Sequence, residues 1–324
     1  MNTTDETRYT PEWLELREGA DAAARARDFL DPLRDHLAAP AARHRRDSRR
    51  PGPVPVPGPE GRTEAEPSGQ KAGPATELMD TPGELVIRDL GCGTGSMGRW
   101  LAPRLNGPQH WILHDRDPDL LDRAVARMPR AAADGSPVTV TTEQGDIAAL
   151  TAADLAGTSL VTASALLDLL TRDEVESLAA ACAGAGCPAL LTLSVAGLVE
   201  LTPADPLDAE IGRAFNAHQR RVDHGRGLLG PDAITVARET FNRQDGGTVR
   251  TYASAWRLGA DESELTAQWL RGWVGAAREQ RPELAPLADA YLTHRLATCA
   301  AGELRAVVHH SDLLALPRLT GETR

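Results

Sequence analysis

Aromatic residues, lysine and long apolar runs are scarce in this chain of 324 residues. Phe, Trp and Tyr make up 4% of the sequence, so a buried core has to consist mainly of Leu, Val and Ala. Lys71 is the single lysine, and arginine carries nearly all of the positive charge. No stretch reaches the roughly 18 apolar residues that a transmembrane helix requires. We therefore expect a globular protein without a membrane span.

Cysteines and targeting signals are also sparse. The four cysteines, Cys92, Cys182, Cys187 and Cys299, form no CxxC pair, and no His/Cys cluster has zinc-ligand spacing. The first residues lack the basic segment and apolar run that mark a signal peptide. These absences predict reduced cysteines, no metal site and a cytoplasmic location.

Positive charge is in the minority. The 46 Asp and Glu residues outnumber the 35 Lys and Arg residues, and the net charge is −11. An acidic surface repels nucleic-acid phosphates and anionic membranes, although a local basic patch can still bind them. We therefore expect a small-molecule partner, and neither a nucleic acid nor a membrane. The composition does not define an oligomeric state.

Two segments of different character precede the regular part of the chain. Residues 10–39 have helical periodicity, Thr10 and Pro11 form a start signal, and Pro40 is expected to end the helix. Residues 43–76 begin with a basic run and continue as a Pro/Gly/Glu/Ser-rich stretch that cannot bury enough apolar surface to fold. We predict an N-terminal helical cap over 1–42 and a disordered linker over 43–76.

Short apolar runs alternate with helical segments from residue 84 onwards. Strands are predicted at 85–89, 111–115, 138–142, 160–164 and 189–195, with helices at 98–105, 118–128 and 172–183 between them. This alternation predicts right-handed βαβ units and hence an α/β domain over 77–317 with a doubly wound, mostly parallel sheet. Further along we expect helices at 206–222 and 230–241, strands at 249–258 and 304–309, and a helical insertion at 261–300.

A glycine-rich loop, DLGCGTG at 89–95, follows the first predicted strand and leads into a helix. Glycines allow a sharp turn and a close approach of the backbone to a ligand. The N-terminus of the following helix offers unpaired N–H groups to a carboxylate or a phosphate. The loop therefore predicts a binding site for a charged ligand.

Two kinds of ligand fit these glycines. Residues 93–98 (GTGSMG) match the GxGxxG pattern of dinucleotide-binding folds, which would indicate a nicotinamide-dependent oxidoreductase. Asp89 stands at the strand end, where its carboxylate would repel a pyrophosphate but can accept a hydrogen bond from an ammonium group. The position of Asp89 therefore favours an amino acid moiety over a dinucleotide.

An acidic segment follows the second predicted strand. Asp115 lies 26 residues after Asp89 and can accept from both hydroxyls of a ribose; Arg116 is its neighbour. Asp117 is the alternative ribose ligand, although Pro118 indicates that Asp117 caps the next helix.

The third and fourth strands end in further candidates. Asp146 can accept from an adenine amino group and the N–H of Ile147 can donate to the ring; a polar turn is the alternative. Ser164 leaves the fourth strand at its carboxyl end, where parallel sheets place ligands, and can line a sulfonium pocket. Leu166 and Leu167 either cover an adenine or belong to the core.

Together these segments resemble the class I S-adenosylmethionine-dependent methyltransferases, over about 84–196 and more loosely to 317. The resemblance is greater to actinobacterial-type members that lack a defined substrate than to members with one. It implies a Rossmann-like sheet of seven strands with an antiparallel last strand, and S-adenosylmethionine as the cofactor. The strands at 249–258 and 304–309 would be the sixth and seventh, and the helical insertion between them is a candidate substrate lid of the methyltransferase domain.

The resemblance also implies a role for each motif. The methionine part would be held by Asp89 and by the loop residues Gly91, Cys92, Gly93 and Gly95. The ribose would be held by Asp115, beside Arg116. The adenine would be held by Asp146 and Ile147, and Ser164 would lie near the sulfonium.

The acceptor side is expected after the fifth strand. His218 is the candidate general base, and Asp223 and Arg226 can hold a polar substrate; a surface helix with a Gly-rich cap is the alternative. For His309 and His310, in and after the last strand, a structural role is favoured.

The N-terminal helix offers a second substrate element. Arg17, Asp21 and Arg25 share one helical face, either as a salt-bridge ladder or because the helix closes over the pocket and Arg17 or Arg25 binds a substrate carboxylate. Trp269 and Trp273, one turn apart, are expected to pack in the core or the lid.

Methyl transfer to a small-molecule acceptor is the function that these features favour. The alternatives are a nucleic-acid methyltransferase, a nicotinamide-dependent oxidoreductase and a non-catalytic protein that binds S-adenosylmethionine. The sequence at 164–167 (SALL) lacks the Asn-Pro-Pro-Tyr type of motif, which argues against methylation of base amino groups.

Overall fold

The computed structural model describes residues 10–47, 83–147, 150–244 and 247–318 of the chain. Residues 48–76 of the predicted linker lie outside these ranges.

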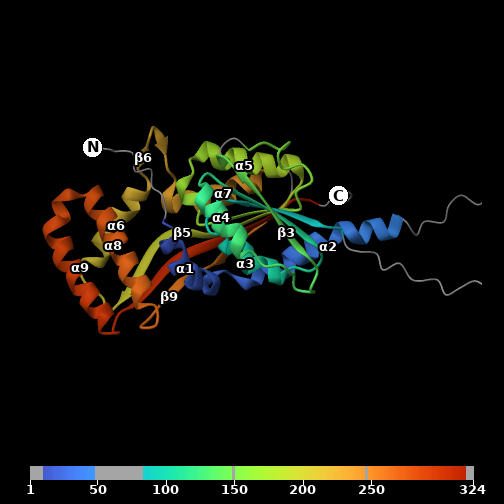
Figure 1. Cartoon of the computed structure of the whole chain (residues 1–324). Helices are drawn as coiled ribbons and strands as arrows, with labels where there is room; N and C mark the ends of the chain where they lie inside the picture. Colours follow the sequence, from blue (N-terminus) through green and yellow to red (C-terminus); the bar gives the residue numbers. More distant parts are fainter. Residues whose placement is uncertain (1–9, 48–82, 148–149, 245–246, 319–324) are drawn as a thin grey trace, which may run out of the picture.

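Strands and helices alternate through the central part, as the apolar pattern predicts (Figure 1). The strands are β1 (Leu85–Leu90), β2 (Gln109–Asp115), β3 (Val138–Gln144), β4 (Leu160–Ser164), β5 (Ala189–Thr202), β6 (Val222–Asp223), β7 (Arg226–Gly227), β8 (Thr248–Ala253), β9 (Trp256–Leu258) and β10 (Arg305–Leu316). The helices are α1 (Pro11–Ala24), α2 (Leu30–Asp47), α3 (Ser96–Leu101), α4 (Pro118–Arg127), α5 (Arg172–Ala185), α6 (Asp208–Gln219), α7 (Ala233–Arg243), α8 (Ser263–Gln280) and α9 (Ala285–Ala300).

The main sheet has the strand order β3-β2-β1-β4-β5-β10-β8, and β9 pairs with one end of β10. Strands β1 to β5 pair in parallel, whereas β10 runs antiparallel to both β5 and β8. This topology confirms the doubly wound, mostly parallel sheet with an antiparallel last strand. The strand order reverses between β1 and β4, which is the place where sheets of this kind bind ligands.

The sheet has eight strands instead of the predicted seven, because the strand predicted at 249–258 is divided into β8 and β9. Ser254 stands at the division. Its backbone N–H donates to His310 O at 2.9 Å, and its hydroxyl donates to Asp312 Oδ1 at 2.6 Å. Strand β10 is irregular at the same level, with register shifts on either side of His310 and Ser311. The irregular pairing explains why one apolar run forms two strands.

Helices cover both faces of the sheet. On one face α5 and α7 pack through Val175 and Val236 on the buried residues of β4 and β5. On the other face α3 and α4 pack through Trp100 and Leu121, together with Phe29 from the segment between α1 and α2. The sheet is therefore buried on both sides, as its apolar strands require.

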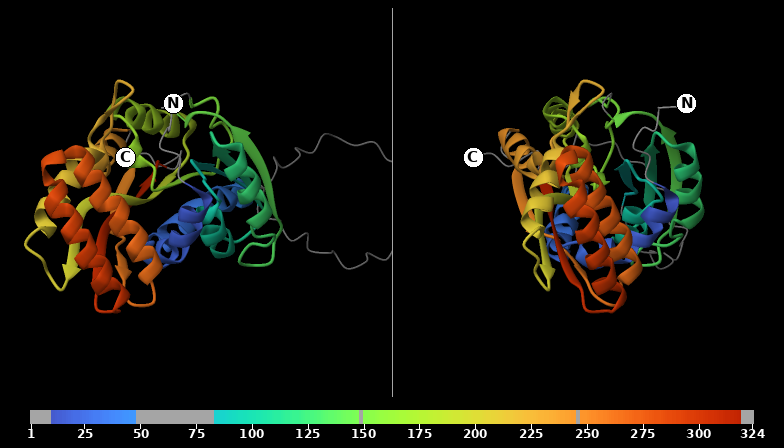
Figure 2. Two further views of the ribbon diagram at one scale, coloured as in Figure 1. Left: turned by 60° about the vertical axis from the view of Figure 1, so that its left-hand side comes forward. Right: turned by 90° about the vertical axis from the view of Figure 1, so that its left-hand side faces the viewer.

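Strands β5 and β10 continue past the rest of the sheet and carry a helical region. They contain 14 and 12 residues, and β9 and the helices α6, α8 and α9 pack on them around a third core. Figure 2 shows α8 and α9 at one end of the molecule and β3 at the other. The helical insertion predicted at 261–300 is thus confirmed as α8 and α9.

The predicted single helix over 10–39 is two helices. It breaks at Arg25, whose φ of −53° and ψ of 127° are not helical. The N–H of Ala26 donates to the buried Asp312 Oδ2 at 2.8 Å instead of to a helix carbonyl. The second helix, α2, continues through Pro40 to Asp47, so the prediction that Pro40 ends the helix was wrong. Proline lacks the N–H of a helix hydrogen bond, but its φ is compatible with the helix.

The helix predicted at 206–222 also ends early. The last residue of α6 is Gln219, and a short hairpin of β6 and β7 follows. His224 and Gly225 have φ of +48° and +81°, a left-handed turn that reverses the chain and cannot continue a helix.

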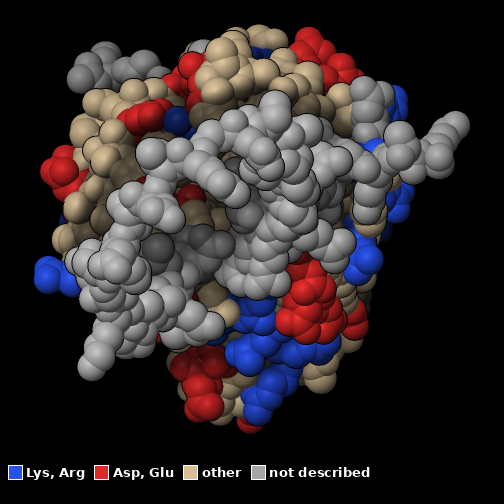
Figure 3. All heavy atoms as spheres, turned by 90° about the vertical axis from the view of Figure 1, so that its right-hand side faces the viewer, with Lys and Arg blue, Asp and Glu red and all other residues tan. Residues whose placement is uncertain are grey.

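Within the described ranges, no helix is both long and apolar enough to cross a membrane. The same residues contain no group of three or more His, Cys, Asp or Glu side chains that could hold a metal ion. All four cysteines are buried and unpaired. Positive and negative side chains lie next to each other on the face that Figure 3 shows, at the end of the molecule where α2 is located.

Candidate functional site

The glycine loop turns sharply at the carboxyl end of β1. Gly91, Gly93 and Gly95 have φ of +60°, +54° and +82°, which side chains disfavour. A Cβ on Gly91 would lie 3.1 Å from Leu166 Cδ1, and one on Gly93 would lie 3.1 Å from Leu14 Cδ1. The backbone conformation therefore favours glycine at these positions, and an added Cβ would also displace the end of a leucine side chain.

Asp89 is almost completely buried beside this loop. Its Oδ1 accepts from Thr162 Oγ1 at 2.7 Å, whereas no described residue donates to its Oδ2. Burial raises the pKa of Asp89 to about 7, against the opposing effects of the Thr162 hydrogen bond and the nearby Arg25. A cationic group next to Oδ2 would both satisfy this oxygen and stabilise the carboxylate.

Asp115 joins the end of β2 to the loop. Its Oδ2 accepts from Gly93 N at 2.9 Å, and its Oδ1 accepts from Asp117 N at 3.0 Å. Asp117 caps α4 by accepting from Asp119 N at 3.0 Å, which confirms the capping role predicted for it. The structure thus separates the two acids: Asp115 faces the loop and Asp117 starts the helix.

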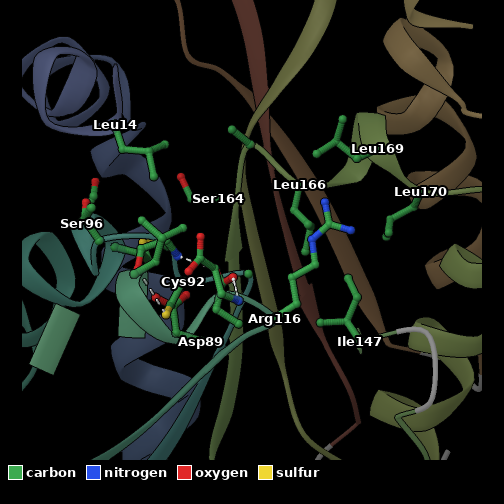
Figure 4. Close-up of a pocket in the computed structure, with 18 of the residues that line it drawn as sticks. Leu14, Asp89, Cys92, Ser96, Arg116, Ile147, Ser164, Leu166, Leu169 and Leu170 are labelled. Carbon is green, nitrogen blue, oxygen red and sulfur yellow. Dashed lines mark hydrogen bonds between the residues drawn. The ribbon is translucent and has the colours of Figure 1, made fainter. Parts of the chain in front are cut away.

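The loop, Asp89 and Asp115 border a cavity of 230 Å³, which we call the glycine-loop cavity (Figure 4). It is lined by nine of the ten predicted cofactor residues, namely Asp89, Gly91, Cys92, Gly93, Asp115, Arg116, Asp146, Ile147 and Ser164. Gly95 is the exception, because it lies behind the loop, where an added Cβ would meet Ala124 of α4 at 3.1 Å. Figure 4 shows Leu166, Leu169, Leu170 and Ile147 on one side of the cavity and Leu14 and Ser96 on the opposite side.

Helix α1 covers this cavity, which the sequence predicted only as an alternative. Leu14, Arg17 and Asp21 contribute to the lining. Ion pairs of Glu15 and Glu18 hold α1 on the sheet domain, and two of them are short. Glu18 pairs with Arg99 of α3 at 2.6 Å, and Glu15 pairs with Arg127 of α4 at 2.9 Å. No sequence spacing identifies these pairs, because their partners lie more than 80 residues apart.

Arg25 does not belong to the predicted salt-bridge ladder. Arg17 and Asp21 do pair, at 2.9 and 3.2 Å, but the helix ends before Arg25. Arg25 is instead buried under the cavity, where its Nη2 donates to Ser96 Oγ at 2.9 Å and to Ser164 Oγ at 3.1 Å. It therefore links the N-terminal segment to two residues that line the cavity.

A second and larger cavity, of 680 Å³, adjoins the first. We call it the tryptophan-lined cavity, because Trp13, Trp256, Trp269 and Trp273 line it. Its wall comes from α1, the turn after β4, β5, α6, β9, α8 and β10. The two cavities share three lining residues: Arg17, Ala165 and Leu169. Two ligands, one bound in each cavity, would therefore contact each other at this boundary.

The predicted acceptor residues are divided between several environments. His218 lines the tryptophan-lined cavity with its Nε2 3.9 Å from Glu279 Oε2, and burial lowers its pKa. Asp223 lines neither cavity and contacts His224 at 3.1 Å in the hairpin. Arg226 lines the glycine-loop cavity and pairs with Glu174 at 2.7 Å.

Two buried residues of the tryptophan-lined cavity were not predicted as site residues. Burial raises the pKa of Asp168 to about 6, and no described residue hydrogen-bonds its Oδ1. Burial lowers the pKa of His310 to about 4, and its Nδ1 also lacks a partner in the part of the chain that the structure describes. The position of Asp168 just after β4, in a segment already noted for Ser164, was the available signal.

Comparison with known families concerns the segment that contains β1 to α5. Residues 87–186 match the model of a family described as a methyltransferase domain. Over these residues the chain is similar to methyltransferase domains. The prediction of a class I methyltransferase is thereby confirmed for the part that holds the glycine loop, and S-adenosylmethionine is the methyl donor of this class.

Several solved structures are similar to this chain at low sequence identity. A cyclopropane synthase from Mycobacterium tuberculosis is 14% identical over 72% of this chain and 78% of that chain, with a TM-score of 0.38. A magnesium protoporphyrin IX methyltransferase from Synechocystis PCC 6803 is 17% identical over 53% and 68%, with a TM-score of 0.35. A methyltransferase from Geobacter sulfurreducens, in complex with S-adenosyl-L-homocysteine, is 16% identical over 72% and 85%, with a TM-score of 0.35. No curated protein sequence matches the chain.

Proposed function

We propose that this methyltransferase transfers the methyl group of S-adenosylmethionine, bound in the glycine-loop cavity, to a small molecule bound in the tryptophan-lined cavity. The observation that carries this proposal is the boundary of the two cavities at Arg17, Ala165 and Leu169. Methyl transfer requires the acceptor atom in line with the methyl carbon and at short distance, and adjoining cavities provide this alignment.

The residues of the glycine-loop cavity fit the amino acid part of the methyl donor. The unpartnered Oδ2 of Asp89 suits an ammonium group. Gly91, Cys92 and Gly93 line this cavity, and the two glycines let the backbone border it without a side chain. Arg25 is buried beneath this cavity and holds Ser164 and Ser96 at its edge by hydrogen bonds to their hydroxyl groups.

The remaining cofactor residues suit a nucleoside. Asp115, at the end of β2, is assigned to the ribose hydroxyls, and Arg116 extends beside it along the cavity (Figure 4). Asp146 and Ile147 are assigned to the adenine, with Leu166 on the apolar side. When bound, S-adenosylmethionine supplies a methyl carbon that the adjacent sulfonium activates.

The protein has three tasks in this reaction. It holds the acceptor, it excludes water, and it receives a proton where the acceptor carries one. Helix α1 contributes to the second task, since Leu14 and Arg17 cover the cavity. His218 is one candidate for the third task, and Asp168, which also lines the tryptophan-lined cavity, is another. Arg17 is a candidate for holding the acceptor, and the ion pair of Arg226 with Glu174 gives Arg226 a structural role as well.

We also propose that the protein is located in the cytoplasm and that its acceptor is a small molecule. Four buried thiols without a disulfide are consistent with a reducing compartment. The net charge of −11 opposes binding to nucleic acids.

Titration calorimetry tests the donor site. We expect S-adenosylhomocysteine to bind and NAD to leave no heat signal; tight binding of NAD alone would make the protein an oxidoreductase instead. Incubation of the protein with a metabolite extract and methyl-labelled S-adenosylmethionine then tests transfer. A labelled small molecule supports the proposal, whereas tight donor binding without any labelled product favours a non-catalytic binding protein.

A further inference from the structure

The tryptophan-lined cavity has a wall of aromatic rings. Trp13, Phe215, Trp256, Trp269 and Trp273 line it, although aromatic residues make up only 4% of the sequence. Trp269 and Trp273 are stacked with ring centroids 5.2 Å apart, and Trp13 meets Trp256 edge to face at 6.4 Å. Ring faces bind flat apolar surfaces, and 680 Å³ is enough for a ligand with more than one ring. The wall therefore suits a planar aromatic molecule.

Four polar atoms of residues that line this cavity have no hydrogen-bond partner among the residues that the structure describes. They are Asp168 Oδ1, Gln219 Oε1, Trp273 Nε1 and His310 Nδ1. Asp168 is 9% exposed and His310 is 6% exposed. Buried polar groups without partners are unfavourable, so polar groups supplied by a ligand stabilise them. The lining thus favours an aromatic ligand with polar substituents over a plain hydrocarbon.

The charges around the cavity favour an acceptor group that becomes negative when it loses a proton, and they disfavour a group that is already positive. Asp168 is the single carboxylate among the described lining residues, against the guanidinium groups of Arg17, Arg221 and Arg271. Arg17 is ion-paired with Asp21, which lines the other cavity. Positive charge nearby stabilises an oxygen from which a proton is leaving and opposes a protonated amine. A hydroxyl group therefore fits this environment better than an amine.

Asp168, the single carboxylate of the described lining, lies in the chain between two residues of the boundary. Ala165 and Leu169, on either side of it, line both cavities. The chain leaves β4 through a left-handed residue, Ala165 with φ of +53°, whose N–H donates to Thr192 O at 2.8 Å. This turn places the segment 165–169 across the boundary. Asp168 and His218 both line the tryptophan-lined cavity and not the other one, but His218 belongs to α6, none of whose residues lies at the boundary.

We infer that the acceptor is an aromatic molecule with an acidic hydroxyl group, of the phenol or enol type, and that Asp168 takes the hydroxyl proton during transfer. This inference rests on the proposed function. The hydroxyl oxygen forms a bond to the methyl carbon while the carbon–sulfur bond breaks. The electron pair of that bond stays on sulfur, which becomes the neutral thioether of S-adenosylhomocysteine, and the proton passes to the Asp168 carboxylate.

Binding and transfer are tested on the full chain with 7-hydroxycoumarin, 2-naphthol and the matched amine 7-aminocoumarin. With S-adenosylhomocysteine present, we expect saturable quenching of tryptophan fluorescence by the two hydroxyl compounds below about 1 mM. With methyl-labelled S-adenosylmethionine, mass spectrometry should find the label on their oxygen. Asp168→Asn should lower kcat about 100-fold, the effect of losing a general base, with unchanged affinity for S-adenosylhomocysteine. Asp168→Glu should recover part of the rate.

Asp173→Asn, an exposed acid in the first turn of α5, is the matched control and should keep the wild-type kcat. Thermal denaturation shows whether each variant is folded. If Asp168→Asn is not folded, the rate of Asp168→Glu and the binding of the three compounds to the wild-type protein test the inference instead. The proposed acceptor class is refuted if only 7-aminocoumarin is labelled, or if none of the three compounds quenches the fluorescence. The role of Asp168 is refuted if Asp168→Asn keeps the wild-type rate, and all the more if His218→Asn loses rate while Asp168→Asn does not. If the wild-type protein does not bind S-adenosylhomocysteine, the proposed function fails first; binding of S-adenosylhomocysteine without any aromatic ligand refutes this inference alone.

Discussion

The glycine-loop cavity and the tryptophan-lined cavity meet at three residues and are otherwise built from different chemistry. The first, of 230 Å³, is bordered by backbone at Gly91 and Gly93 and by the carboxylates of Asp89 and Asp115. The second, of 680 Å³, is bordered by aromatic rings and holds a single carboxylate among its described lining residues. The first suits a charged ligand. The second suits a larger apolar one.

The two cavities also differ in how they are supported. Apart from α1, Leu169, Leu170 and Arg226, the glycine-loop cavity is formed by residues 89–166 at the ends of parallel strands. The tryptophan-lined cavity takes residues from the N-terminal helix, from the extensions of β5 and β10, and from the inserted helix α8. Substitutions in the helical region should therefore change acceptor binding and stability while leaving the donor site intact, and the predictions below test this separation.

The largest effect is expected from Trp269→Ala in the helical region. This change removes the ring stacked on Trp273 and should lower the free energy of unfolding by about 3–5 kcal/mol, as for other large-to-small core changes. Affinity for S-adenosylhomocysteine should stay within about two-fold, because the sites share few contacts. Urea denaturation and calorimetry measure the two quantities, with Trp269→Phe as the milder control. A parallel loss of donor affinity would refute the separation.

Gly93→Val should abolish donor binding. The side chain would be forced into a φ of +54° and towards Leu14, so we expect at least about a 100-fold loss in affinity for S-adenosylhomocysteine, or ~2.7 kcal/mol. Gly135→Val is the matched control, because Gly135 has φ of +84° with nothing within 4 Å of an added Cβ. The control shares the backbone strain but not the crowded site. Equal loss of affinity in both variants would mean that strain alone, and not contact with the ligand, explains the result.

Asp89→Asn should lower donor affinity about 10- to 100-fold and remove its dependence on pH. The pKa of Asp89 is about 7 without ligand, and an ammonium group next to it would lower that pKa. Ionised Asp89 thus contributes to affinity above pH 7, and this contribution is lost as the pH falls below 7. Calorimetry between about pH 5.5 and 8.5 measures the profile. Asp117→Asn, which keeps its helix cap, should retain the wild-type profile, and a flat profile in the wild-type protein would count against the role of Asp89.

Glu18→Gln should have the smallest effect. It breaks the ion pair with Arg99 and a longer one with Arg127, which hold α1 over the glycine-loop cavity, and partly exposed pairs contribute about 0.2–1 kcal/mol each. We expect a two- to five-fold faster release of S-adenosylhomocysteine in stopped-flow measurements, and less difference from wild type at high salt. Glu12→Gln, an exposed acid on the same helix, should release the ligand at the wild-type rate. An unchanged rate in Glu18→Gln would show that α1 does not limit release.

Several predictions from the sequence depended on local spacing, and these hold in the structure. The alternation of strands and helices, the turn at Gly91 and Gly93, and the cap at Asp117 each involve residues close together in the chain. The predictions that were wrong depended on distant partners. The helix predicted over 10–39 breaks where Ala26 N–H donates a hydrogen bond to Asp312. The strand predicted over 249–258 divides where Ser254 donates hydrogen bonds to His310 and Asp312. No periodicity carries that information.

The sequence by itself determined the type of fold and the nature of the donor site, because a strand, a glycine turn and an acid at each strand end act over a few residues and need only parallel pairing to converge. Only the tertiary structure decided where the tryptophan-lined cavity, the acceptor site that we propose, is formed. The extensions of β5 and β10, the inserted helices and α1 meet there from positions far apart in the chain, and Asp168 becomes a buried acid through what packs around it. Burial, which sets its pKa, is a property of the assembled molecule.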